Sequence, residues 1–210
     1  MTFGFFITLE GGEGAGKTTQ ISHLKAALEK HGHEVVVTRE PGGTPESEAV
    51  RELLSHNYYG PKWSPDAETM LLFAARAMHI RDVIAPALND NKVVICDRYV
   101  DSTRVYQGIV QKIDPVFLQC LEVQIIGKLM PDLTIVLDIS SEETMKRIEA
   151  RGGVKDHYDE AGADFHEMIR QGFLDIAQLD PDRCRVINAE QEEQLIAEQI
   201  KKEALDILHA

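Results

Sequence analysis

Short apolar runs alternate along the chain with longer stretches in which apolar residues recur at helical spacing. The runs are rich in valine, isoleucine and leucine and show no polar alternation, which is typical of strands buried on both faces. They predict five strands, at residues 3–10, 34–39, 92–96, 133–138 and 185–187.

The stretches between these runs have the period of amphipathic helices. Ser64 before Pro65 is a favourable helix start, because serine caps the first turn and proline fits its first position. The pattern predicts helices at residues 17–31, 46–55, 65–89, 114–128, 141–151, 164–178 and 190–208. Such alternation predicts an α/β domain over residues 1–210: a five-stranded parallel sheet with helices on both faces and its ligand at the carboxyl ends of the strands.

Composition restricts the function classes. The 210 residues suit one domain, and the net charge of −13 argues against nucleic acid or an anionic membrane as partner. No apolar run approaches the ~18 residues of a membrane span, and no signal peptide is visible at the start. Cys96, Cys120 and Cys184 lack metal-type spacing and are expected as free thiols. We therefore expect a cytoplasmic protein.

A phosphate-binding loop follows the first strand. Its sequence is Gly11-Gly12-Glu13-Gly14-Ala15-Gly16-Lys17-Thr18, the pattern G-x-x-x-x-G-K-S/T between a strand and a helix. Glycines let backbone N–H groups surround phosphates, and the helix N-terminus adds partial positive charge. Lys17 is expected to reach the β- and γ-phosphates of a nucleoside triphosphate, and Thr18 to bind Mg²⁺.

Two other strands end in polar residues at the same edge of the sheet. Asp97 and Arg98 follow one of them, and the turn Arg39-Glu40-Pro41-Gly42-Gly43-Thr44 follows the other. Arg98 suits a bidentate grip on a phosphate, and Asp97 could hold Mg²⁺ through water or orient an acceptor. A strand-end ion pair is the alternative, but the neighbouring phosphate loop favours a second phosphate site.

Residues 147–162 are expected to form a mobile lid. They are rich in glycine and charge, and they contribute Arg147, Arg151 and Lys155 in an otherwise acidic protein. A basic lid that closes over phosphates would exclude water from the reaction.

Phe73 and Arg76 share one face of the longest predicted helix, where a ring and a guanidinium could bind a base. Their spacing alone favours a core phenylalanine and an ion-paired arginine. His79, on the same helix, is expected to be a core residue.

Several motifs together resemble bacterial thymidylate kinases, which are P-loop nucleoside monophosphate kinases. They include the phosphate loop, the run Thr38–Pro45, Phe73-Ala74-Ala75-Arg76, and Asp97-Arg98-Tyr99 with Tyr106-Gln107-Gly108. Pro131-Asp132-Leu133 and Phe165-His166 extend the resemblance to nearly the whole chain. The chain departs from the usual pattern at Thr103, Arg104 and Val105.

The resemblance implies transfer of the γ-phosphoryl group of ATP to dTMP with Mg²⁺, in dTTP synthesis. It implies ATP contacts at Gly11, Gly12, Glu13, Gly14, Ala15, Gly16, Lys17, Thr18, Thr19 and Arg147. It implies dTMP contacts at Glu13, Arg39, Glu40, Phe73, Arg76, Arg98, Ser102, Thr103, Tyr106 and Gln107. The implied catalytic residues are Glu13, Lys17, Asp97, Arg98 and Arg151, with Thr18 and Asp97 at the metal.

Glycine follows Glu13 in the loop, so the chain resembles the members that carry their donor arginine in the lid. In the acceptor site, Phe73 would stack on thymine, Arg76 would reach its O4 edge, and Tyr106 would leave no room for a 2′-hydroxyl. Glu13 would face the 3′-hydroxyl. The resemblance also implies a homodimer packed through helices beside the acceptor pocket.

Four alternatives differ in chemistry. Another nucleoside monophosphate kinase would differ only in its base site, whereas a deoxynucleoside kinase would need a base such as Asp97 or Glu10 to activate a hydroxyl. A switch GTPase would carry Asn-Lys-x-Asp, but Asn91-Lys92 is followed by valines. A module that binds nucleotide without turnover is disfavoured by the intact Lys17, Thr18, Asp97 and Arg98.

Overall fold

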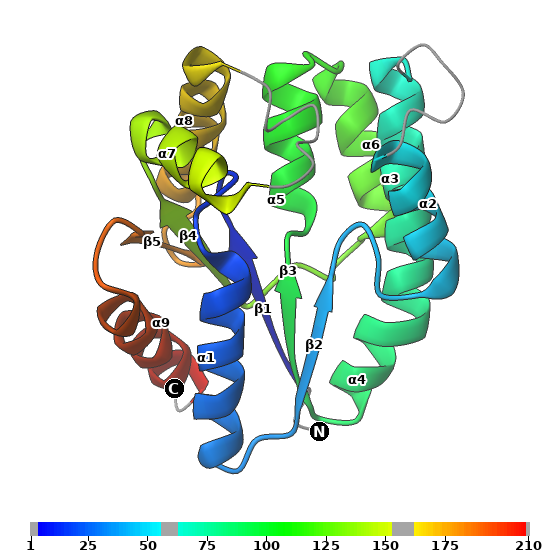
Figure 1. Ribbon diagram of the computed structural model, residues 1–210. Helices are drawn as coiled ribbons and strands as arrows, with labels where there is room; N and C mark the ends of the chain where they lie inside the picture. Colours follow the sequence, from blue (N-terminus) through cyan, green and yellow to red (C-terminus); the bar gives the residue numbers. More distant parts are fainter. Residues whose placement is uncertain (1–3, 56–62, 153–161, 209–210) are drawn as a thin grey trace.

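A five-stranded parallel sheet lies at the centre of the computed structural model, which describes residues 4–55, 63–152 and 162–208 (Figure 1). All strand pairs are parallel. In sheet order the strands are β2 (Val35–Arg39), β3 (Val93–Asp97), β1 (Phe5–Glu10), β4 (Leu133–Asp138) and β5 (Cys184–Asn188). The predicted sheet and all five strands are confirmed, with ends shifted by one or two residues where they are described.

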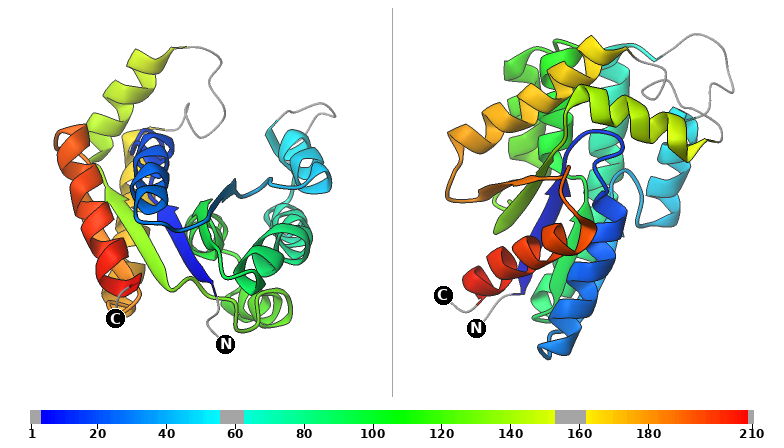
Figure 2. Two further views of the ribbon diagram at one scale, coloured as in Figure 1. Left: turned by 90° about the horizontal axis from the view of Figure 1, so that it is seen from below. Right: turned by 60° about the vertical axis from the view of Figure 1, so that its left-hand side comes forward.

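Helices cover both faces of the sheet, because alternate residues of the central strands point to opposite sides. Ile7 and Ile95 pack in the core beneath α1 (Lys17–Lys30) and α9 (Glu193–Leu208), which lie side by side in Figure 2. Phe6 and Val94 pack on the other face, where the covering helices include α3 (Pro65–His79), α6 (Pro115–Ile125) and α8 (Ala163–Leu179). Because both faces are covered, the strands carry apolar residues continuously.

The helix predicted at 65–89 is less regular than expected. It begins at Pro65 behind the Ser64 cap, whose hydroxyl accepts from the Ala67 N–H at 3.3 Å. A π-helical turn, Ile80–Ile84, then separates α3 from α4 (Ala85–Asn89). Pro86 follows this turn and cannot donate a backbone hydrogen bond to the preceding turn, so a locally wider helix is the physical consequence.

A helical segment over residues 100–110 was not predicted. It consists of α5 (Val100–Thr103) and a π-helical continuation, Arg104–Val110. A residue of β1 caps its first turn. The Glu10 carboxylate accepts hydrogen bonds from the Tyr99 N–H at 2.7 Å and from the Ser102 hydroxyl at 2.6 Å. Buried polar side chains on this segment obscure the apolar period that would have marked it as a helix.

The remaining helices border the carboxyl edge of the sheet, where α2 (Pro45–Ser55) follows β2 and α7 (Ser141–Arg151) follows β4. Residues 153–161 of the expected lid, including Lys155, lie outside the described residues. In the described part of the chain, no helix is both long and apolar enough to cross a membrane. Cys96, Cys120 and Cys184 are free, as predicted.

Replacing Arg183 with alanine is expected to lower the free energy of unfolding by about 3 kcal/mol, because the buried Asp101 carboxylate loses the closer of its two arginine partners and keeps only Arg104. Arg183 is nearly buried and donates to Asp101 at 2.6 Å, and Asp101 is 1 % exposed. Urea unfolding measures the loss. Arg185→Ala, which breaks a partly exposed pair with Glu203, is the control and should cost under about 1 kcal/mol. Equal losses in both variants would contradict the expectation.

Candidate active site

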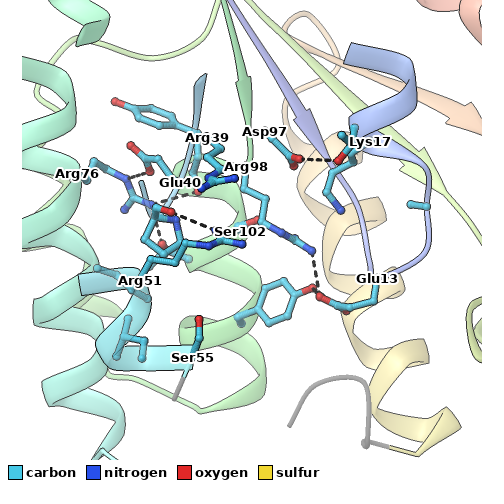
Figure 3. A pocket seen from close by; sticks show the side chains of 18 of the residues that line it. Glu13, Lys17, Arg39, Glu40, Arg51, Ser55, Arg76, Asp97, Arg98 and Ser102 are labelled. Carbon is cyan, nitrogen blue, oxygen red and sulfur yellow. Dashed lines mark hydrogen bonds and ion pairs between the residues drawn. The ribbon is translucent and has the colours of Figure 1, made fainter. Parts of the chain in front are cut away.

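A cavity of about 520 Å³ opens at the carboxyl ends of β1, β2 and β3 (Figure 3). Its walls come from the phosphate loop, the strand ends, α2, α3 and the helical segment 100–110, with Arg151 from the end of α7. Most predicted site residues line it: Glu13, Gly14, Ala15, Gly16, Lys17, Thr18, Thr19, Arg39, Glu40, Arg76, Asp97, Arg98, Ser102, Thr103, Tyr106, Gln107 and Arg151. Four predicted residues do not line it: Gly11, Gly12, Phe73 and Arg147.

The phosphate loop has the backbone that its glycines allow. Gly14 and Gly16 have φ of 71° and 88°, in the left-handed region that side chains with a Cβ disfavour, and Gly16 caps α1. Lys17 turns back over the loop, and its Nζ donates to the carbonyls of Gly11 at 3.0 Å and Gly12 at 2.9 Å. Burial, together with the nearby Arg98 charge, lowers the pKa of Lys17 to about 8. An anionic phosphate is the ligand that would offset this burial.

Arg98 connects the phosphate loop to the opposite wall. Its backbone has φ of 66°, a strained conformation for a residue other than glycine. Its guanidinium donates to the Gly11 carbonyl at 3.0 Å, to the Ser102 hydroxyl at 3.1 Å and to Glu13 at 3.0 Å. Five N–H donors in a planar fork suit this position, because the same group can bind a phosphate on its cavity side.

Glu13 is held in an ionised state by its neighbours. The Tyr106 hydroxyl donates to its carboxylate at 2.8 Å, and Arg98 binds the same oxygen. Burial would raise the pKa of Glu13, but Arg98 and Lys17 outweigh it and lower the pKa below the usual range. A carboxylate fixed in this way can accept a hydrogen bond from a sugar hydroxyl in the cavity.

Asp97 and Thr18 lie together at the mouth of the phosphate loop. The Thr18 hydroxyl is 3.5 Å from Asp97 Oδ2, and Asp97 Oδ1 is buried without a hydrogen-bond partner in the structure. An orphaned carboxylate oxygen beside a hydroxyl fits Mg²⁺, which takes few protein ligands and completes its shell with phosphates and water. No cluster of three or more acidic, histidine or cysteine residues that could bind a metal occurs among the described residues.

A buried ion pair forms the floor beneath the second half of the cavity. Arg76 donates to Glu40 at 2.6 Å and to the Thr103 hydroxyl at 2.9 Å. Glu40, which precedes a cis proline, also contacts His79 at 3.0 Å. His79 is fully buried, so its predicted role as a core residue is confirmed.

Three predicted residues lie differently from the simplest expectation. Phe73 belongs to the core, with the Arg76 guanidinium 4.9 Å above its ring. Arg147 packs behind the phosphate loop, where it donates to the Gly14 carbonyl at 3.1 Å and the Ala189 carbonyl at 3.0 Å. Arg39 forms an exposed pair with Glu48 at 2.9 Å. Arg104, the departure from the family pattern, points away from the cavity and binds Asp101 and Glu122.

Sequence reasoning missed two charged residues in the cavity, Arg51 and Glu68. Arg51 projects from α2, and it donates to the Pro41 carbonyl at 3.1 Å. Burial and the neighbouring Arg39 lower the pKa of Arg51. Helix α2 folds back over the turn that follows β2, and this brings Arg51 beside Arg39. A basic residue in the helix that follows such a turn was the available signal.

The family follows from comparison with known proteins. A model of the family described as thymidylate kinase matches residues 9–200. The chain belongs to the thymidylate kinase family. A thymidylate kinase of Caulobacter vibrioides is 50% identical over 192 residues, covering 91% of each chain. One of a Bradyrhizobium species is 47% identical over 188 residues, covering 89% of this chain and 83% of its own.

A solved structure supports the same assignment. The crystal structure of thymidylate kinase from Ehrlichia chaffeensis has a TM-score of 0.77 and 34% identity, and the match covers 96% of this chain and 99% of that one. The P-loop kinase-type fold expected from the sequence is therefore confirmed. This member of the thymidylate kinase family is a nucleoside monophosphate kinase, a nucleotide-binding phosphotransferase. The switch GTPase and the other kinase classes are not favoured.

Proposed function

We propose that this chain, as one domain over residues 1–210, transfers the γ-phosphoryl group of ATP to dTMP and yields ADP and dTDP. The observation that carries the proposal is the position of Arg98, which bonds to the Gly11 carbonyl on one side and to Ser102 on the other. Arg98 therefore links the phosphate loop, which would hold the triphosphate, to the pocket that would hold the second nucleotide. In-line transfer needs this juxtaposition of two phosphates.

The donor side consists of the phosphate loop, residues 11–19, and the two arginines of α7. Backbone N–H groups of the loop bind the phosphates of ATP, and Lys17 neutralises their charge. Arg151 lies at the cavity end of α7 and approaches the transferring group. Arg147 lies behind the loop and donates hydrogen bonds to the carbonyls of Gly14 and Ala189, so it supports the loop on the adenosine side.

The acceptor side lies between α3 and the helical segment 100–110. Arg98 binds the acceptor phosphate together with Arg39 and Arg51, and Ser102 helps to orient Arg98. Arg76 and the cavity-lining groups around it, Glu40, Thr103 and Gln107, receive the base, and Phe73 supports the Arg76 guanidinium from the core. Tyr106 lies below the deoxyribose, and Glu13 accepts from its 3′-hydroxyl.

Mg²⁺ is the metal that the donor set fits. Thr18 would bind it directly, and Asp97 would hold it through its unpartnered oxygen. When bound, Mg²⁺ supplies charge neutralisation at the phosphates.

No strong base is needed on the protein. The acceptor is a phosphate monoester, whose second pKa near 6 makes it an adequate nucleophile at neutral pH. The protein's contribution is positioning, together with positive charge from Lys17, Arg98 and Arg151 where negative charge spreads in the transition state.

An ADP-release assay across dTMP, dUMP, UMP, dCMP and thymidine tests the proposal. The expected result is that dTMP has the highest kcat/KM and thymidine has none. Preference for thymidine, or nucleotide hydrolysis that no acceptor stimulates, would overturn it.

Replacing Arg151 with alanine is expected to lower kcat by about 10²-fold with little change in the dissociation constant of dTMP, because Arg151 acts on the transferring group. Single-turnover kinetics and dTMP titration separate the two effects. Lys146→Ala, which removes an exposed cation on the same helix, is the matched control. Equal losses in rate and in binding would mean that Arg151 only binds substrate.

The affinity for ATP is expected to weaken as the pH rises through about 8, by up to about tenfold per pH unit. Burial lowers the pKa of Lys17 to about 8, so the free enzyme carries the Lys17 charge below this pH and loses it above. Titration calorimetry with ATP from about pH 7 to 9.5 measures the effect. Lys17→Arg keeps its charge and should show a flat profile. An equally flat wild-type profile would contradict the assignment.

We also propose a cytoplasmic homodimer. Met70 on α3 and Val116 and Val123 on α6 are 50%, 73% and 61% exposed, which gives the neighbouring helices beside the acceptor pocket an apolar surface. The acidic surface charge offers nothing to a nucleic acid or an anionic membrane. Analytical ultracentrifugation tests this surface: the wild type should sediment as a dimer and the Val123→Asp variant as a monomer. A Val123→Asp variant with the mass of the wild-type dimer would count against this surface.

A further inference from the structure

Glu68 lies in the wall of the acceptor pocket, on the first turn of α3. One of its carboxylate oxygens, Oε1, accepts from the side-chain amide of Gln107 at 2.8 Å and from that of Gln111 at 2.9 Å. Gln107 belongs to the helical segment 100–110, and Gln111 caps the end of that segment. Glu68 therefore bonds across the pocket wall to a residue that also lines the cavity, Gln107.

This contact fixes which way the Gln107 amide points. A carboxylate can only accept hydrogen bonds, so the amide must turn its NH₂ group toward Glu68. Rotation of the amide by half a turn would place its carbonyl oxygen against the carboxylate, and two acceptors repel. The Gln107 side chain is 2 % exposed, so water cannot relieve such a mispairing. The carbonyl oxygen of Gln107 is thus the atom left to act on a ligand.

Arg76 supplies a donor to the same pocket. Its Nε donates to Glu40, and its Nη2 donates to the Tyr99 carbonyl and the Thr103 hydroxyl. The remaining nitrogen, Nη1, is buried without a hydrogen-bond partner in the structure. A buried unpaired guanidinium nitrogen has a large desolvation cost unless a ligand accepts from it. The pocket therefore offers one fixed donor and one fixed acceptor.

We propose that Glu68 is a positioning residue that selects the base. By holding Gln107 with its oxygen toward the ligand, it makes the pocket match a pyrimidine whose ring N–H adjoins a carbonyl. Thymine has this pattern at N3 and O4. Cytosine has the reverse pattern, with a ring acceptor beside an amino donor, and would place acceptor against acceptor at Gln107. The inference rests on the proposed acceptor site and deepens it, since it names how the site rejects dCMP.

Replacement of Glu68 with glutamine tests the inference. Glutamine has the same shape but can donate as well as accept, so the Gln107 amide becomes free to reverse and to pair with cytosine. We expect the ratio of kcat/KM for dTMP to that for dCMP to fall by about tenfold or more, with the value for dCMP rising. Glu68→Leu, which holds neither orientation, should lower the ratio in the same direction if the glutamine variant does not fold.

Two controls separate selection from a structural effect. Asp66→Asn removes the same charge from the same helix turn, but Asp66 is exposed and does not line the cavity, so the ratio should be unchanged. In a Gln107→Leu background, Glu68→Gln should not change the ratio further, because no amide remains to be oriented. Equal losses for dTMP and dCMP in the Glu68 variants, or an unchanged ratio, would overturn the inference. A wild-type enzyme without activity on dTMP would instead overturn the proposed function.

Discussion

Replacing Lys17 with methionine is expected to lower kcat/KM for dTMP phosphorylation by about 10²- to 10³-fold. Methionine has a similar length but carries no charge, so the phosphates of ATP lose the buried cation that lies over the loop. Lys17 is proposed to neutralise the negative charge that spreads over the phosphates during transfer, and therefore kcat should fall more than KM rises. Initial-rate kinetics with both substrates varied separate these effects.

The Lys17 variant needs a structural control, because Nζ also holds the loop carbonyls of Gly11 and Gly12. Lys25→Met removes an exposed cation from the same helix, where it pairs with Glu29. It should retain wild-type rates. If Lys17→Met turned over dTMP normally, the phosphate loop would not be the donor site. If it unfolded at a much lower temperature, Lys17→Arg would provide the comparison of rates.

Replacing Arg98 with methionine should cause a loss of similar size, about 10²- to 10³-fold in kcat/KM, but with a different signature. Arg98 is proposed to bind the acceptor phosphate in the ground state as well as in transfer. Its removal should therefore weaken dTMP binding and lower kcat together, while ATP binding changes little. Arg98→Lys should recover only part of the loss, because an ammonium group cannot reproduce the planar fork.

Arg104→Met is the matched control for Arg98. It lies on the same segment, but its guanidinium pairs with Asp101 and Glu122 outside the cavity. It should cost some stability and leave the affinity for dTMP unchanged. An Arg98 variant that lost ATP affinity and kept dTMP affinity would reverse the proposed arrangement of the two sites.

The sheet and the phosphate loop could be predicted from sequence because their signals are local. Buried parallel strands need continuous apolar residues, and the loop needs glycines at fixed positions, as the φ angles of Gly14 and Gly16 show. The position of Asp97 and Arg98 at the carboxyl edge of the sheet could also be predicted, because parallel strands bring their carboxyl ends together.

What could not be predicted depends on contacts between distant segments. The helical segment 100–110 is capped by Glu10, some 90 positions earlier, and buries polar side chains in ion pairs and in the cavity. Arg51 reaches the cavity only because α2 folds back over the turn after β2. The orientation of Gln107 is determined by Glu68, 39 positions away. Local periodicity contains none of this information.

In the proposed arrangement, one cavity holds both nucleotides with their phosphates adjacent. A compound in which adenosine and deoxythymidine are joined through a chain of phosphates tests it most directly. We expect one molecule to bind per chain and to inhibit competitively against both ATP and dTMP. Competition with only one substrate, while the other still binds at its normal affinity, would contradict it.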